Sequence, residues 1–499
     1  MRSAILVPYD RLNRARGALT TATPQSHDII SVRIDGLIRS RAWNAQRLHL
    51  ILSAAEHFLA DLEAEGFRVH HVTAPTLAAG IAEARRQFSI DDITATEPST
   101  YAQARVFEAC GVRTVPDDFF LTPRTVFRAW ASTQKSLKME PFYREQRRRL
   151  RILMDGDQPV GGSWNLDAEN RLPPPKTPHP WPAPLHHQTD EIDARVWAQI
   201  IDAGYPVVGA PPDGTWPTTR EGALRQLSHF VEHGLAEFGP YEDAMPKDSW
   251  AVSHSLLSPS LNLGLITPDE AVAAVISRFD AGGIPLASCE GFVRQVIGWR
   301  EYVNGAYWHF GPDYRDRNGL AAERPLLPLF EDPNATRMHC VGSILGDLRA
   351  RGWTHHIPRL MVLSNLALIT GVQPQSFLEW MKREFVDAND WVMVPNVIGM
   401  GVHADGGQMM TKPYAAGGAY ISRMGQFCGD CAYDPKKRTG DTACPFTTLY
   451  WDFIDRHREQ FARNPRIAQQ VRGLDRLSDL DAVRARATEV LDGLERGEV

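Results

Sequence analysis

Short apolar segments alternate with helix-like segments over residues 1–125. Between candidate strands, residues 41–65 carry apolar side chains at helical spacing. Strands that alternate with helices are typical of an open α/β sheet, which we expect to be parallel. No GxGxxG follows the first strand, so the dinucleotide fingerprint is absent. The candidate strands read AILVPY, HDIISVRI, FRVHHVT and ITATEP.

The pattern changes after the α/β segment. Within residues 155–220, LPPPKTPHPWPAP places seven prolines between Pro173 and Pro184, which excludes a helix interior or a central strand. We interpret it as an extended connector. From about residue 220 the apolar positions recur at helical spacing, and Thr267-Pro268-Asp269-Glu270 has the form of a helix start. The sequence thus predicts an α/β domain (1–130), a connector (131–220) and a large helical domain (221–499).

Composition limits the class of protein. A hydrophobic fraction of 43% and a charged fraction of 23% are ordinary for a soluble protein. We find no apolar run near 18 residues and no signal-peptide pattern at the N-terminus, so we expect a cytoplasmic protein with no membrane contact. The net charge of 54 − 60 = −6 means that any nucleic-acid contact must come from a local basic patch.

Three of the six cysteines form a cluster, Cys428-x2-Cys431-x12-Cys444-Pro445. Six cysteines in 499 residues are no disulfide scaffold, so the cluster indicates a metal site. Either zinc or an iron–sulfur cluster could use these thiolates. The alternative is that the cysteines are scattered buried thiols that bind no metal. The second ligand pair of a zinc ribbon is missing, and Cys-Pro favours [4Fe–4S]. A fourth thiolate would then come from Cys110, Cys289 or Cys340.

Four segments of the second half resemble the photolyases and cryptochromes, in the order found in that family. They read SHSLLSPSLNLG (253–264), GFVRQVIGWREY (291–302), THHIPR (354–359) and FVDAND (385–390). The first is similar to a phosphate-binding turn at a helix start. Each segment alone is weak evidence for the family, but four such segments in the family's order are not expected to occur by chance.

The resemblance is closer for one branch, the iron–sulfur bacterial cryptochromes and photolyases, also called prokaryotic (6-4) photolyases. LKMEPFYREQRRRLRILMDG (137–156), GGSWNLDAENR (161–171) and the cysteines at 340, 428, 431 and 444 resemble that branch. It implies the photolyase architecture, in which a Pro-rich connector joins the α/β domain to an all-α FAD-binding domain. It also implies FAD and a [4Fe–4S] cluster held by Cys340, Cys428, Cys431 and Cys444.

The implied activity is light-driven DNA repair, a carbon–carbon lyase reaction. Excited reduced FAD passes an electron to a flipped-out pyrimidine lesion, which we expect to be the (6-4) photoproduct, with the cyclobutane dimer as another possibility. The partner would be UV-damaged DNA, bound by a monomer in a bacterial cytoplasm. The alternative hypothesis is a cryptochrome-like blue-light receptor with the same cofactors. A redox protein without a light role is a third, but no nicotinamide site is evident.

The resemblance assigns site residues one by one. His356 corresponds to the proton donor beside the lesion, with His355 before it, and Trp380 to a tryptophan used in flavin photoreduction. Imidazole suits proton transfer because its pKa lies near working pH. The implied FAD contacts are Tyr241, His254, Ser255, Leu256, Leu257, Ser258, Gln295, Trp299, Arg300, Arg359, Asp387, Asn389 and Met393.

Each assignment has an alternative in which the residue has only a structural role. The histidine pair could be a capped helix start with surface histidines, and Arg359–Asp387 an ordinary helix–helix ion pair. Trp380 could be a core aromatic. The basic run at 147–151, with Arg144, could meet phosphates or form a solvated or interdomain face.

Three positions depart from the branch. The lumazine-type antenna that it usually binds is doubtful here, because the expected polar positions read Tyr9-Asp10-Arg11-Leu12 and Trp43-Asn44-Ala45-Gln46-Arg47. Met381 stands where a tyrosine is expected after Trp380, so photoreduction would be slower or rerouted. Met393 stands near the position that faces flavin N5, where photolyases carry a polar residue.

Overall fold

The computed structural model describes residues 2–499. Its N-terminal part holds a five-stranded parallel sheet in the order β4-β2-β1-β5-β6, which confirms the predicted open α/β sheet. The fifth strand was not predicted, because its three residues show no apolar alternation. The strands are β1 (Arg2–Leu6), β2 (His27–Ile34), β4 (Val69–Ala74), β5 (Ile90–Thr96) and β6 (Arg113–Val115).

Helices cover both faces of this sheet. Alternate residues of β1 point to opposite sides, so Ala4 and Leu6 join one buried cluster while Ile5, with Val7 just after the strand, joins another. The first cluster lies under α3 (Leu77–Phe88) and α4 (Tyr101–Ala109), and the second under α2 (Ala45–Ala64). The second cluster continues into the helical part of the molecule, so the sheet and the helices share buried surface.

The segment 131–220, predicted as a connector, contains two helices, one on each side of its proline-rich stretch. Residues 139–150 form α6 (Met139–Leu150), and 191–202 form α7 (Glu191–Asp202), which packs on α2. The Asp190 side chain and Asp193 close a capping box at the start of α7, a local signal stronger than the proline-rich context before it. Residues 171–190 contain no helix or strand. Short pairs complete the segment: β3 (Trp43–Asn44) with β9 (Val207–Val208), and β7 (Met154–Asp155) with β8 (Gln158–Pro159).

The remainder of the chain is helical, as predicted. The capping box of Thr267 and Glu270 begins α11, with Pro268 in the first turn. The helices that matter below are α8 (Arg220–His229), α10 (Ser258–Leu263), α11 (Pro268–Asp280), α12 (Leu286–Val293), α13 (Glu301–Phe310), α14 (His339–Arg351), α15 (Asn365–Thr370), α16 (Pro374–Glu384), α17 (Asp390–Val394), α18 (Gly418–Met424), α19 (Pro445–Arg456) and α22 (Leu480–Arg496).

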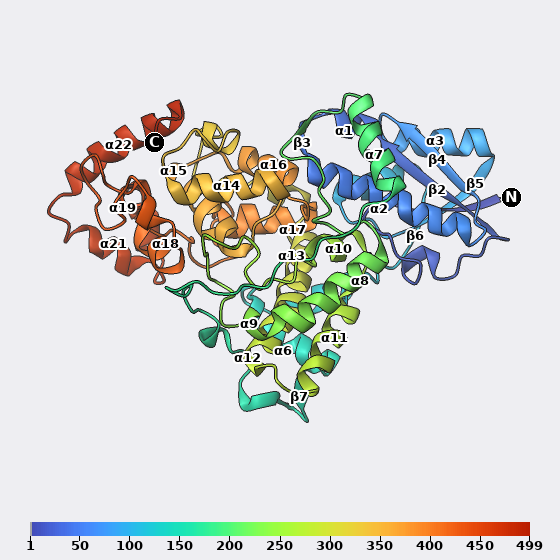
Figure 1. The fold of residues 1–499 in the computed structure, drawn as a ribbon, viewed down its shortest axis with the longest axis horizontal. Coiled ribbons are helices and arrows are strands. Elements are labelled where there is room, and N and C mark those ends of the chain that lie inside the picture. Colours follow the sequence, from blue (N-terminus) through green and yellow to red (C-terminus); the bar gives the residue numbers. More distant parts are fainter. Residues whose placement is uncertain (1) are drawn as a thin grey trace.

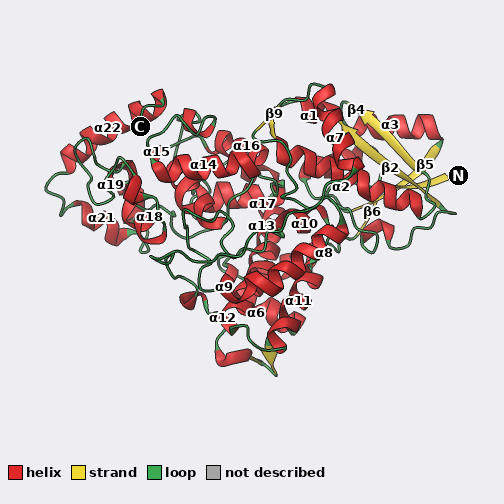
Figure 2. Cartoon of the chain, in the orientation of Figure 1, coloured by secondary structure: helices red, strands yellow, loops and turns green. Residues whose placement is uncertain are grey.

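The molecule has three lobes in Figure 1. The sheet lies at one end with the N-terminus, and Figure 2 shows the main sheet's strands gathered there. Helices α18, α19 and α22 form the opposite end with the C-terminus, while α6, α11 and α12 extend from the middle (Figure 1). None of the helices in residues 2–499 combines the length and apolar character needed to cross a membrane.

A glycine sets the approach of α13 to α5 (Arg124–Ser132). A Cβ on Gly305 would overlap the Phe127 ring, whereas a Cβ on Gly346 of α14 would meet no atom within 4 Å. We therefore expect Gly305→Ala to lower the free energy of unfolding by about 1–3 kcal/mol through overpacking. Gly346→Ala is the matched control and should raise it by about 0.5–1 kcal/mol. Urea denaturation of both variants measures this, and equal stability of the two would contradict the packing argument.

Candidate functional site

One cavity of about 640 Å³ opens in the helical part of the molecule. Its size is within the range of roughly 300–1,000 Å³ that is typical of sites for small molecules and cofactors. Most of the residues predicted as contacts line it, although they come from segments more than 130 positions apart. These are His254, Ser255, Leu256, Leu257, Ser258, Gln295, Trp299, Arg300, His355, His356, Arg359, Asp387 and Met393.

Three walls of the cavity are π-helical turns. They cover residues 294–300, 358–364 and 395–401, each set within or beside an α-helix. A π turn inserts one residue into the helical ladder and is frequent at functional sites, because it turns side chains out of the regular register. Here the three turns supply Gln295, Arg359 and Asn396 to the cavity wall.

A buried ion pair closes one side of the cavity. The Arg359 guanidinium donates to both carboxylate oxygens of Asp387, each at 2.9 Å, and the Ser258 hydroxyl donates to Asp387 Oδ2 at 2.7 Å. Burial raises the pKa of Asp387, but the Arg359 charge and these hydrogen bonds outweigh it and hold the pKa below its usual value. The carboxylate is therefore ionised and fully engaged. Ser258, predicted as a cofactor contact, uses its hydroxyl on this pair.

The serine-rich turn before α10 has an unusual backbone. Val252 and Leu256 both adopt positive φ, of 51° and 57°, which costs about 1–3 kcal/mol for each residue. The turn brings His254 and Ser255 to the cavity wall. Strained backbone of this kind persists only where surrounding contacts enforce it, and it gathers at ligand sites.

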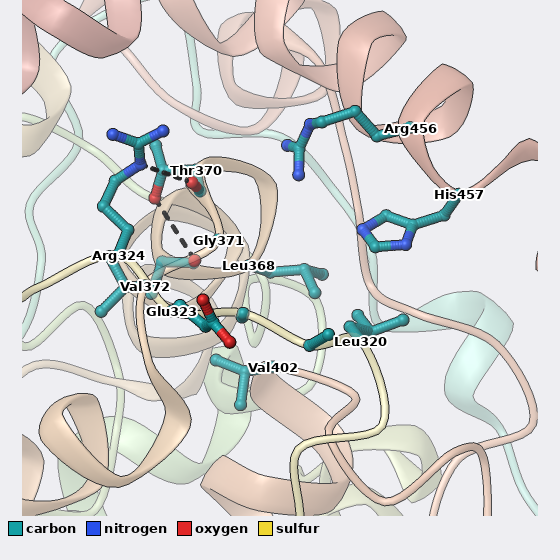
Figure 3. Close-up of a pocket in the computed structure, with 13 residues that line it drawn as sticks. Leu320, Glu323, Arg324, Leu368, Thr370, Gly371, Val372, Val402, Arg456 and His457 are labelled. Atoms are coloured by element: carbon teal, nitrogen blue, oxygen red, sulfur yellow. Dashed lines mark hydrogen bonds between the residues drawn. The ribbon is translucent and has the colours of Figure 1, made fainter.

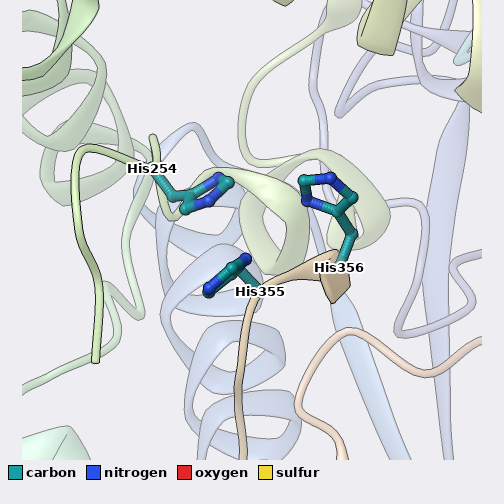
Figure 4. A group of neighbouring side chains, drawn as sticks. All are labelled: His254, His355 and His356. Atoms are coloured by element: carbon teal, nitrogen blue, oxygen red, sulfur yellow. The ribbon is translucent and has the colours of Figure 1, made fainter. Parts of the chain in front are cut away.

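Three histidines meet at the cavity (Figure 4). The rings of His254 and His355 stack with centroids 4.5 Å apart, and His356 lies edge-on to His254 at 5.6 Å. Burial lowers the pKa of His254 to about 3, and it lowers that of His355 well below the ordinary value, with the neighbouring imidazoles adding to the effect. The stacked pair is therefore neutral.

His356 differs from the other two in its partner. Its Nε2 lies 3.2 Å from Asp243 Oδ1, and its side chain is 47% exposed, on the wall of the cavity. Burial lowers its pKa, but the hydrogen bond and charge of Asp243, with the Glu242 charge, raise it overall. Burial also raises the pKa of Glu242 to about 7. The cavity thus holds one histidine set up to carry a proton.

The other predicted residues, Tyr241, Trp380 and Asn389, are not part of the cavity lining. Trp380 is 2% exposed and donates from Nε1 to the Phe330 carbonyl at 2.9 Å, and its neighbour Met381 is the residue that lines the cavity. Asn389 donates to the Asn262 carbonyl at 3.4 Å and precedes α17, while Tyr241 packs against Trp181.

Sequence reasoning missed several lining residues. Arg294 lies 3.1 Å from Asp167 and is buried, and its place beside Gln295 in the GFVRQVIGWREY motif could have drawn attention to it. Asp243 carries no such signal, because its pairing with His356 exists only in three dimensions. Further lining residues that were not predicted include Met139, Glu242, Asn262, Trp353, Trp391 and Tyr414.

The four cysteines of the predicted cluster come from three places in the chain but lie together. Cys340 is buried in the first turn of α14, Cys428 begins a 3-10 turn that Cys431 follows, and Cys444 directly precedes α19. Burial raises the pKa of the Cys340 thiol, and the other three cysteines add to the shift. Cys110 and Cys289 lie elsewhere, in the α/β part and in α12.

The spacing of the thiols indicates what kind of metal group they could bind. All six cysteines are among the described residues, and no three of their sulfurs lie within 4.8 Å of one another. Four sulfurs at about 2.3 Å from one tetrahedral zinc would be about 3.8 Å apart. The wider arrangement fits a group larger than a single ion.

The cavity's donor set can be tested against FAD, which the resemblance implies. Among the described lining residues, His254 Nε2, His355 Nδ1 and Trp353 Nε1 are buried without a hydrogen-bond partner. Buried polar atoms without partners are rare in folded proteins unless a ligand or water satisfies them. With an apolar floor that includes Leu257, Trp391 and Met393, the residues present fit a planar heteroaromatic group with polar edges.

A second cavity, of about 340 Å³, lies between α15 and α19 (Figure 3). Two arginines line it, and both are already paired. Arg324 donates to the Thr370 carbonyl at 3.0 Å and pairs with Glu495. Arg456 donates to the Ile369 carbonyl and pairs with Asp452 at 2.7 Å. These arginines therefore cap the C-terminal end of α15 and stabilise the fold there.

Arginines of the basic run and of the positions compared with an antenna site bind groups within the protein. Arg147 is buried and donates to the carbonyls of Trp164 and Leu153. Arg47 is also buried and donates to the carbonyls of Phe385, Val386 and Ala388 at 2.9, 3.2 and 2.6 Å. Arg11 pairs with Asp117 at 2.7 Å. None of these three guanidiniums is a free phosphate-binding group.

The comparisons with known proteins support one family. Residues 5–216 match the family model described as deoxyribodipyrimidine photo-lyase-related protein. A (6-4) photolyase of Agrobacterium fabrum (strain C58 / ATCC 33970) is 38% identical over 500 residues, and the match covers 96% of each sequence. An uncharacterized protein of Acanthamoeba polyphaga mimivirus is 32% identical over 101 residues, which cover 20% of this chain and 75% of the viral protein.

Two solved structures share the fold. A bacterial class III photolyase from Agrobacterium tumefaciens matches with a TM-score of 0.54 at 16% identity, covering 99% of this chain and 98% of that one. The cryptochrome of Synechocystis sp. PCC6803 matches with a TM-score of 0.54 at 15% identity, covering 80% and 82%. These two likenesses concern the fold, and the 38% identity over almost the whole chain adds the family. The chain therefore belongs to the photolyase/cryptochrome superfamily, in the branch of the iron–sulfur bacterial cryptochromes and prokaryotic (6-4) photolyases.

Proposed function

We propose that this protein is a light-driven DNA repair enzyme that acts on the (6-4) photoproduct. The observation that carries the proposal is the position of His356, whose pKa is raised by Asp243, on the wall of the cavity that Arg359 and Asp387 also line. The relative with the same printed activity, 38% identical over 96% of the chain, supports it.

In this proposal the cavity binds FAD and accepts a base flipped out of the DNA. When bound, FAD supplies the electron that light transfers to the lesion. The residues of the chain position the partners. Arg359 and Asp387 would place fixed charges beside a bound flavin, the neutral His254 and His355 would line its site, and Leu257 and Trp391 would exclude water. His356 holds a proton on Nε2 or Nδ1 and gives it to the lesion as general acid.

For the cysteines we propose a [4Fe–4S] cluster with Cys340, Cys428, Cys431 and Cys444 as ligands. Four thiols at wider spacing than a zinc site support it, and such clusters are held by four thiolates. Its role would be structural. The Met245 N–H donates to the Met424 carbonyl at 2.8 Å, and Gln426 N–H to the Met245 carbonyl at 3.2 Å, so the cluster loop supports the segment that bears Asp243.

His356→Asn tests the repair function. We expect reduced wild-type protein in blue light to restore a (6-4) oligonucleotide, and the variant to lose about 10²–10⁴-fold in rate while keeping FAD, because it lacks the general acid. A cyclobutane-dimer oligonucleotide and a dark reaction are run beside it. Unchanged repair by the variant would remove His356 as proton donor. If the wild type restores neither lesion with flavin bound, the cryptochrome-like receptor replaces the enzyme.

Asp243→Asn tests how the proton is held. The Asp243 carboxylate raises the pKa of His356, so repair should fall as pH rises through that pKa. Without the carboxylate, burial lowers the pKa, and this alkaline limb should move to lower pH while repair at acidic pH persists. The measurement is the pH profile of repair under saturating light. A profile with the wild-type limb would show that Asp243 does not set the protonation of His356.

Cys431→Ala tests the cluster. We expect loss of iron from about four atoms per chain, together with insoluble or cofactor-poor protein. Cys110→Ala is the control, since Cys110 lies in the α/β part, and it should keep its iron. Iron and zinc analysis and the flavin content of each purified variant decide the outcome. A soluble Cys431→Ala protein with full flavin content would overturn the structural role, and zinc in the wild type would overturn the cluster.

A further inference from the structure

Trp353 connects the cavity to a group of tryptophans outside it. It follows α14, is 5% exposed, lines the cavity, and its buried Nε1 has no partner among the described residues. Its ring centroid lies 5.7 Å from that of Trp250 and 6.3 Å from that of Trp216, which are distances of direct aromatic contact. Neither of these two residues lines the cavity.

Trp250 brings this group to the protein surface. It is half-buried, and the Arg351 guanidinium lies over its ring at 4.9 Å from the centroid. Asp347 pairs with Arg351 at 2.7 Å and so offsets the positive charge beside the ring. Trp216 is fixed in the group by its Nε1, which donates to the Arg351 carbonyl at 2.8 Å, and its ring lies 6.4 Å from Trp250. A path of indole rings thus runs from the cavity wall to solvent in one step.

Trp380 has no comparable path. Its ring contacts within the described residues are Phe330, Phe377 and Phe385, at 4.7, 5.5 and 6.3 Å. Phenylalanine is much harder to oxidise by one electron than tryptophan or tyrosine. The next residue, Met381, lines the cavity but has no aromatic ring to extend a chain. An oxidising equivalent on Trp380 would stay buried.

We propose that Trp353 and Trp250 form an electron route from the protein surface to the cavity and that this route serves flavin photoreduction. The inference rests on the proposed binding of FAD in the cavity. Trp353 gives one electron to light-excited oxidised flavin and is refilled by Trp250. Trp250 releases its indole proton to water and recovers a hydrogen atom from a small-molecule thiol. Two rounds supply two electrons to the flavin, which takes up the two released protons, and two thiols become one disulfide.

The test uses the oxidised holoprotein with excess dithiothreitol under blue light without oxygen. We expect Trp250→Phe to lose most of the wild-type rate of flavin photoreduction and the long-lived indole radical seen by transient absorption. Trp250→Tyr, which keeps an oxidisable ring, should recover part of the rate. The matched control is Trp451→Phe, a half-buried tryptophan in α19 beside Tyr450, and it should behave as wild type.

Two results would overturn the route. One is a wild-type rate of photoreduction in Trp250→Phe with full flavin content. The other is loss of photoreduction in Trp380→Phe while Trp250→Phe is unaffected, which would place the route at Trp380. Chemical reduction by dithionite separates this question from the proposed function, since Trp250→Phe reduced in that way should repair like the wild type. If dithionite-reduced wild type repairs nothing, the repair function fails while the photoreduction result still decides the route.

Discussion

The buried pair of Arg359 and Asp387 is the contact on which the site depends. A charged pair removed from water is costly unless its geometry and further hydrogen bonds compensate. Here Arg359 also donates from Nε to the Thr354 carbonyl at 2.7 Å, and Asn262 donates to the Asp387 carbonyl at 2.7 Å. Through these bonds the pair joins the histidine segment, the loop after α16 and the start of α10. Each of these segments supplies part of the cavity wall.

The loop after α16, which bears Asp387, also connects the α/β domain to the cavity. Arg47, at the start of α2, donates to carbonyls on both sides of Asp387, and burial lowers its own pKa to about 10. A guanidinium with that pKa is still protonated near neutrality, so its charge adds to the field that keeps Asp387 ionised. The α/β domain therefore acts on the site through Arg47, although the strands of its sheet lie at the far end of the molecule (Figure 1).

The backbone around the cavity departs from regular helical geometry at several positions. Three π-helical turns and the positive-φ residues Val252 and Leu256 surround it, and a further π-helical turn at Phe230–Gly234 continues α8. Departures from local preference of this kind are expected at functional sites, where the rest of the fold compensates them. The three histidines also show how the fold sets the properties of a side chain. The pKa values of His254 and His355 are lowered because these rings are buried against each other, whereas the pKa of His356 is raised because it faces a carboxylate.

The sequence by itself determined the features that depend on neighbours along the chain. Strand and helix periodicity predicted the sheet, the capping box of Thr267 began α11 where expected, and motif order indicated the family. Tertiary structure decided the rest. Asp243 meets His356 across 113 positions, Arg47 reaches the loop after α16, and Trp250 packs edge-on to Trp353. Such contacts leave no local pattern, because their free energy comes from burial and from charges brought together only when the whole chain is folded.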